Sequence, residues 1–304
     1  MKEFALDIQK FVSKNKKLFV VMFAIAIGIA TALMIVASFL DYQISVALYN
    51  SSQLYSRIFE YFGEWPAYAI YVGFPISLFV WLVRTKRYWW SPLAMAYALG
   101  FGFFFVRGVM FPVTWQNLLF NTITIVSMLV VFFKIEEKNL FKIMFLLLIA
   151  FIITQVVYLL MLLVKAVWGR VRFRDIYCDY AYTDWWVING INGHEAFFSG
   201  HVLAALSLAF IWLLPALFNI KNKFALWSII LIPIWYSVSM MYARIAMGAH
   251  YLSDVAFSVI ILSVFTIGMM KWMFVYANKN GRIEKDEVKE INVQSENVHD
   301  AENN

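Results

Sequence analysis

The sequence predicts an all-α polytopic membrane protein, a helical bundle with about eight transmembrane spans. The chain of 304 residues is 62% hydrophobic and only 14% charged, which is unusual for a soluble domain. Its apolar residues fall in long continuous runs, and ~20 helical residues suffice to cross a hydrocarbon core of about 30 Å. Short loops that contain lysine and arginine separate these runs.

The apolar runs place the spans along the chain. The first run, 18–40, is longer than the apolar core of ~7–15 residues in a secretory signal, so we expect a retained span. Runs 90–111 and 115–133 form either two spans or a shallow hairpin, and the hairpin would leave six spans. The other spans are expected at 66–83, 143–164, 199–217, 225–242 and 251–275.

The basic residues predict the orientation of the bundle, because cytoplasmic loops carry an excess of lysine and arginine. Basic clusters alternate with poorer loops, so we expect both termini in the cytoplasm and the loop 165–199 on the outer face of the cell membrane. A hairpin at 90–133 would leave this orientation unchanged. The clusters lie at Lys14–Lys17, Arg84–Arg87, Lys134–Lys142, Lys221–Lys223 and Lys271–Arg282.

Charge and cysteine content argue against several function classes. The net charge of +6 is spread through the loops rather than gathered on one face, so no nucleic-acid partner is expected. The only cysteine, Cys178, cannot form an internal disulfide, and there is no CxxC pair or Cys/His cluster to hold zinc. We therefore predict no metal and no cofactor. Protein partners cannot be predicted from these features.

Charged residues are concentrated in three short segments, each where a predicted span meets the outer face. The segments are Lys165–Arg172, Phe198–His201 and Ala243–Asp254. Interface cations that only snorkel would be expected on the cytoplasmic side, and these lie on the opposite one. Since arginine can bind an oxyanion through two hydrogen bonds, Lys165, Arg172 and Arg244 are predicted to bind a phosphate.

The second segment fits an anion site at the start of a helix, where free N–H groups and the helix dipole favour negative charge. Ser199 can cap the helix or donate its hydroxyl, and Gly200 allows close approach of the backbone. His201 lies on the first turn and would face the same anion. A plain serine cap with an incidental histidine explains these residues equally well.

The third segment places His250 and Asp254 four residues apart, on one face of a helix. An aspartate at that spacing can hold one imidazole nitrogen and leave the other free as a nucleophile or base. The alternatives are a His–Asp hydrogen bond that only packs two helices, or a metal site. A metal would need further ligands, and the other outer-loop histidines are His194 and His201, so catalysis is favoured.

Together, the three segments resemble the type-2 phosphatidic acid phosphatase family, whose pattern is K-x6-R-P, then P-S-G-H, then S-R-x5-H-x3-D. The order and the spacing agree, and the resemblance covers roughly residues 141–275. The matching residues are Lys165, Arg172, Ser199, Gly200, His201, Arg244, His250 and Asp254.

Three positions depart from the family pattern. Phe173 and Phe198 stand where the family has proline, and Ala243 stands where it has serine. None of the three family residues transfers a proton or attacks phosphorus. Loss of the serine hydroxyl removes one donor to phosphate, which is compatible with reduced or altered activity and does not imply inactivity.

The resemblance implies a metal-independent lipid phosphatase that works through a phosphohistidine. His250 would attack phosphorus, Asp254 would orient it and His201 would protonate the leaving oxygen, while the cations, Ser199 and Gly200 would bind the phosphate. The implied substrate is a lipid phosphate at the outer face, such as undecaprenyl diphosphate, phosphatidylglycerol phosphate, phosphatidate or a lipid A phosphate. The alternatives are a lipid phosphotransferase and a non-enzymatic lipid-phosphate carrier or transporter.

These expectations divide the chain into four parts. Residues 1–17 form a cytoplasmic segment, and 18–140 form an N-terminal transmembrane region. Residues 141–277 form the catalytic transmembrane core. Residues 278–304 form an acidic cytoplasmic tail that is expected to be disordered.

Overall fold

The computed structural model describes residues 16–109, 115–176, 181–218 and 220–272. Within these ranges every regular element is a helix, which confirms the all-α prediction. Five helical stretches are long and apolar enough to cross a membrane, so the prediction of a polytopic membrane protein is also confirmed. They are Lys17–Leu48, Leu54–Arg84, Glu137–Asp175, Lys223–Ala246 and Leu252–Trp272.

The total number of spans and the cytoplasmic placement of the termini stay predictions. The proposed N-terminal segment lies almost wholly outside the described residues, and the acidic tail lies entirely outside them. The division of the chain into four parts is likewise a prediction.

The apolar runs become helices because a backbone in hydrocarbon must satisfy its own hydrogen bonds. The N-terminal half contains α2 (Lys16–Leu48), α3 (Leu54–Phe62), α4 (Trp65–Arg84), α5 (Ser91–Val109) and α6 (Trp115–Lys134). The C-terminal half contains α7 (Glu137–Trp168), α8 (Gly200–Leu206), α9 (Leu214–Phe218), α10 (Lys223–Ala246) and the helix Leu252–Trp272.

Two of the differences from the expected ranges bear on the site. Helix α2 continues to Leu48, eight residues past the expected end of its span, and so includes Asp41. The expected span 199–217 consists of α8, a 3₁₀ segment Ser207–Leu213 and α9. The Ser207 hydroxyl donates to the Ala204 carbonyl at 2.6 Å, a local bond that competes with the regular helical ladder.

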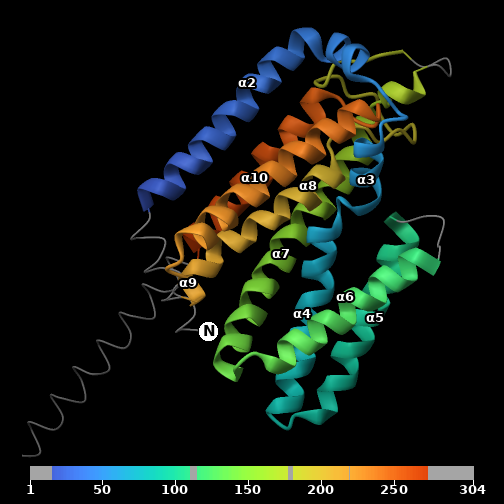
Figure 1. The fold of residues 1–304 in the computed structure, drawn as a ribbon. Helices are drawn as coiled ribbons and strands as arrows, with labels where there is room; N and C mark the ends of the chain where they lie inside the picture. Colours follow the sequence, from blue (N-terminus) through green and yellow to red (C-terminus); the bar gives the residue numbers. More distant parts are fainter. Residues whose placement is uncertain (1–15, 110–114, 177–180, 219, 273–304) are drawn as a thin grey trace, which may run out of the picture.

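The long helices lie side by side, and α8 with its 3₁₀ continuation packs among α4, α7 and α10 (Figure 1). Helices α5 and α6 pack against α4 and diverge from the rest of the bundle. At the end of the bundle drawn at the top of Figure 1, the loop after α7 meets the C-terminal ends of α2 and α10. The three charged segments gather at this end.

The outside of the bundle is apolar. Large side chains such as Ile25, Phe39, Trp227 and Trp235 are exposed on α2 and α10. Exposed apolar surface on this scale is unfavourable in water but suits contact with lipid chains. The apolar composition of the chain is thus explained by a helical bundle whose surface contacts lipid.

Candidate active site

The first charged segment is shaped by a turn at Gly169. This residue ends α7 in the left-handed conformation at φ 55°, and its N–H donates to the Lys165 carbonyl. A Cβ atom there would lie 2.1 Å from the Gly190 carbonyl oxygen, so the close approach needs glycine as well. The turn leaves Lys165 on the last turn of α7 and sends Arg170 into the protein interior, where it is fully buried.

The second segment forms a capped helix start. Ser199 is the N-cap of α8, and its side chain accepts a hydrogen bond from the Val202 N–H. The Ser199 N–H donates to the Ser258 hydroxyl at 3.1 Å, which ties α8 to the last helix. A Cβ atom on Gly200 would lie 2.8 Å from the Met161 sulfur, so this glycine also permits the packing of α8 on α7. Capping and packing therefore account for part of the serine–glycine pair.

In the third segment, His250 is buried and its Nδ1 lies 2.6 Å from the Ala196 carbonyl oxygen. A carbonyl can only accept, so we assign the ring proton to Nδ1, which leaves the Nε2 lone pair free. Asp254 Oδ2 lies 3.6 Å from the same Nδ1, too far for a good hydrogen bond. In this geometry a backbone carbonyl orients the imidazole, and Asp254 adds a nearby negative charge.

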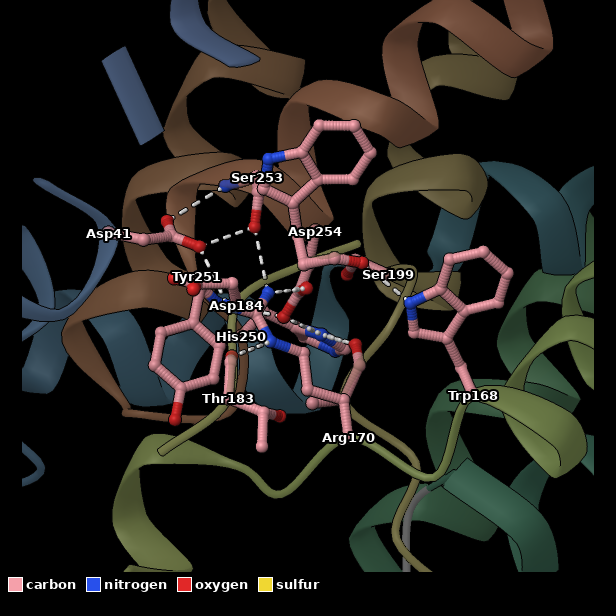
Figure 2. A network of polar contacts seen from close by, with 12 residues as sticks. Asp41, Trp168, Arg170, Thr183, Asp184, Ser199, His250, Tyr251, Ser253 and Asp254 are labelled. Atoms are coloured by element: carbon pink, nitrogen blue, oxygen red, sulfur yellow. Dashed lines mark hydrogen bonds and ion pairs between the residues drawn. The ribbon is translucent and has the colours of Figure 1, made fainter. Parts of the chain in front are cut away.

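Asp254 is itself held by a buried ionic network that sequence reasoning missed (Figure 2). Arg170 Nη1 donates to Asp254 Oδ1 at 2.6 Å and Nη2 donates to Asp41 Oδ2 at 2.8 Å. Asp41 also accepts from the N–H and the hydroxyl of Ser253. The Arg170 guanidinium lies 4.0 Å from the centre of the Tyr251 ring, a cation–π contact. Two carboxylates from opposite ends of the chain thus share one arginine.

A sequence signal for this network exists. Asp41 is the only charged residue between Leu18 and Leu48, and an ionisable residue in an apolar helix normally has a partner inside the protein. Arg170 lies within the first charged segment but between the two residues that match the family pattern. The sequence shows both residues but does not show that they meet.

The predicted phosphate-binding cations act on His250 through their charge. Burial is the main cause that lowers the pKa of His250 well below its ordinary value, and Lys165, Arg244, Arg172 and His201 lower it further by their charge. His250 is therefore neutral at neutral pH, as a nucleophile must be. Arg172 Nε and Arg244 Nε and Nη1 are buried and make no hydrogen bond with the part of the chain that the structure describes. Buried donors without acceptors are costly, and an oxyanion would satisfy them.

Two glutamates from the N-terminal half also reach the site, and sequence reasoning missed both. Glu64 Oε1 lies 2.9 Å from His201 Nδ1. Glu60 Oε1 lies 3.8 Å from Arg244 Nη1 and 3.6 Å from Arg174 Nη1. The carboxylates thus offset part of the positive charge of the cation cluster.

The three departures from the family pattern are buried packing positions. Phe173 packs edge-on against Tyr49 with ring centres 5.3 Å apart. Phe198 packs against Phe257 with ring centres 5.4 Å apart, and Ala243 belongs to an apolar cluster between α8 and α10. The two phenylalanines at the proline positions are thus held by aromatic contacts.

The structure contains no candidate metal site among the residues it describes, taking groups of three or more His, Cys, Asp or Glu side chains. Metal independence remains a prediction, to be tested by chelation.

Comparison with known proteins gives one finding about the chain. Residues 139–278 match the family model described as PAP2 superfamily. No match was found among curated proteins or among solved structures. The matched range contains all three charged segments, whereas Asp41, Glu60 and Glu64 lie outside it.

Proposed function

We propose that this membrane protein hydrolyses a lipid-linked phosphate through a phosphohistidine on His250, because residues 139–278 match the PAP2 superfamily, whose members are phosphatases. The observation that carries the proposal is the free Nε2 of a buried, neutral histidine amid cations with unsatisfied donors. Such an arrangement suits attack on a bound phosphoryl group.

Substrate binding relies on Lys165, Arg172 and Arg244. Their ammonium and guanidinium groups bind the phosphoryl oxygens, and the arginines supply the donors that lack acceptors in the free protein. The start of α8, at Ser199 and Gly200, adds helix-dipole stabilisation on the same side. These groups also stabilise the charge that develops on the oxygens in the transition state.

The reaction has two steps. The lone pair of His250 Nε2 forms a bond to phosphorus while the bond from phosphorus to the leaving oxygen breaks. That oxygen keeps the electron pair and takes a proton from His201 Nε2. Neutral His201 then removes a proton from water, the water oxygen binds phosphorus, and the electron pair of the P–N bond returns to His250.

Asp254 acts on His250 by charge. The phosphohistidine carries a positive imidazole ring, and a carboxylate 3.6 Å from Nδ1 stabilises it. Arg170 fixes the position of this carboxylate by an ion pair. Its positive charge also offsets part of the negative charge that Asp254 presents to His250. The hydrogen bond to the Ala196 carbonyl holds the imidazole ring in the orientation needed for the attack.

The bilayer-facing surface of the bundle favours a lipid substrate over a soluble one. An apolar cavity of about 630 Å³ lies between α2 and α10, and its lining includes Ile245 and Leu252, close in sequence to Arg244 and His250. A hydrocarbon chain would fit such a cavity. We propose the outer face of the cell membrane as the place of reaction, with undecaprenyl diphosphate, phosphatidylglycerol phosphate, phosphatidate and a lipid A phosphate as substrates to compare.

Phosphate release should occur without metal. We expect purified, detergent-solubilised protein to release inorganic phosphate from at least one of these four lipids, at the same rate with and without EDTA. The physical reason is that the cations and His250 together supply both charge stabilisation and the nucleophile. The measurement is a phosphate assay over the lipid panel, with added Mg²⁺ as a matched condition.

Two results would contradict this proposal. Loss of release in EDTA with recovery on addition of a divalent cation would replace the histidine mechanism by a metal-dependent one. Transfer of the phosphoryl group to a second lipid without release of inorganic phosphate would identify a phosphotransferase.

A further inference from the structure

We propose that Glu64 is a positioning residue that orients His201 and favours its protonated form for release of the leaving group. This inference rests on the proposed function, in which His201 is the general acid. Glu64 lies in the N-terminal half of the chain, outside the matched range 139–278. The site would then be completed by a helix that the three motifs do not include.

The geometry selects one tautomer and one direction for His201. Glu64 Oε1 lies 2.9 Å from His201 Nδ1, hydrogen-bond distance for a carboxylate and an imidazole. A carboxylate accepts only, so Nδ1 carries a proton and Nε2 is left to face the substrate. Both side chains are largely shielded, which strengthens the interaction relative to an exposed pair.

The carboxylate of Glu64 is not needed to build the helix it precedes. Glu64 is the N-cap residue of α4, yet its side chain makes no capping hydrogen bond. The break between α3 and α4 at Gly63 instead brings the chain against α10, where a Cβ on Gly63 would lie 2.0 Å from the Met240 methyl carbon. The backbone thus carries the Glu64 side chain to the site, and the side chain serves His201.

The surroundings of His201 explain why a contact with the Glu64 carboxylate would matter. Burial is the main factor that disfavours a positive imidazole at His201, and the charges of Arg244 on α10 and Lys165 on α7 disfavour it further; His250 is also within electrostatic reach. Glu64 acts in the opposite direction, through its charge and its hydrogen bond, whereas the ion pairs of Glu60 are with Arg174 and Arg244. Without the Glu64 charge, His201 would lose its proton at a lower pH.

The test separates proton donation from folding by varying the leaving group. Glu64→Gln keeps the size of the side chain and removes its charge. With 4-nitrophenyl phosphate, whose leaving group needs no proton, we expect a loss of kcat/KM below about fivefold. With phenyl phosphate, whose leaving group is much more basic, we expect a loss of ~10²-fold, the scale of general acid catalysis.

The pH profile with the lipid substrate gives a second readout. The basic limb of kcat/KM should move to lower pH in Glu64→Gln by about one unit or more, because the imidazolium has lost its neighbouring negative charge. Glu64→Asp should restore most of the wild-type limb. Glu137→Gln, which removes an exposed carboxylate at the start of α7, is the control for charge loss alone and should match wild type.

The outcomes also separate this inference from the proposed function. Equal losses on the two aryl phosphates, together with an unmoved basic limb, would overturn the role of Glu64 while leaving the phosphatase proposal intact. Absence of phosphate release by the wild-type protein from every substrate would overturn the proposed function, and the role of Glu64 with it.

Discussion

Replacing His250 with alanine should reduce phosphate release from the best lipid substrate by at least about 10³-fold, the scale seen when a catalytic nucleophile is removed. His250 is buried and oriented through Nδ1, and its Nε2 is the proposed nucleophile, so the substitution removes the attacking lone pair. The Ala196 carbonyl would be left without its donor, a structural cost confined to one hydrogen bond.

The His250 prediction has a direct chemical signature. Brief incubation with ³²P-labelled substrate, followed by denaturation in base, should trap a labelled protein in the wild type and none in His250→Ala. The label should be released by mild acid, as expected of phosphohistidine. His194→Ala changes a histidine of the loop before α8 that has no assigned role, and it should keep both the label and the turnover. Label retained by His250→Ala would disprove the assigned nucleophile.

Arg170→Gln should both destabilise the protein and reduce its activity. Removing one partner of a buried ion pair costs ~3–5 kcal/mol, because the charges left behind have no compensation. Here two carboxylates, Asp41 and Asp254, would face each other without the guanidinium that binds both. Thermal unfolding in detergent should show a marked fall in midpoint, and phosphate release should fall because Asp254 no longer keeps its place beside His250.

Arg174→Gln is the matched control for loss of an arginine near the site. Its ion pair with Glu60 is partly exposed, so its contribution to stability should be below ~1 kcal/mol. Arg170→Lys should not rescue the network, since an ammonium cannot reproduce a planar group that binds two carboxylates and stacks on Tyr251. Equal unfolding midpoints for Arg170→Gln and Arg174→Gln would show that the network is not a source of stability.

Hydropathy predicted the helical class and the apolar segments, and residue spacing predicted the three charged segments of the site. These features could be predicted because each of them depends on residues close together in sequence. The end of α2 was missed because Asp41 marks the end of a hydrophobic run, and only its contact with Arg170, 129 residues later, allows it to lie inside the protein. Similarly, nothing local to Glu64 indicates a partner on α8.

The hydrogen bonding of His250 could also be predicted only in part from residue spacing. The i, i+4 relation placed His250 and Asp254 on one face, and they do lie together. It could not show that the Ala196 carbonyl takes the hydrogen bond to Nδ1, because that carbonyl comes from a loop whose path depends on Gly169 and Trp168. Trp168 Nε1 donates to the Trp185 carbonyl at 2.6 Å and so helps to fix this loop.

The pairing of Asp41 with Arg170 also has a consequence for the order in which the helices are inserted into the membrane. Asp41 enters the membrane with the first helix, long before its partners Arg170 and Ser253 have been translated, 129 and 212 residues later. An ionisable group costs free energy in hydrocarbon until it is paired, so we expect the C-terminal end of α2 to stay near water while the later helices are inserted. The proposed active site is therefore complete only when the helix Leu252–Trp272 has entered the bilayer, and a nascent chain that lacks this helix also lacks Ser253 and Asp254.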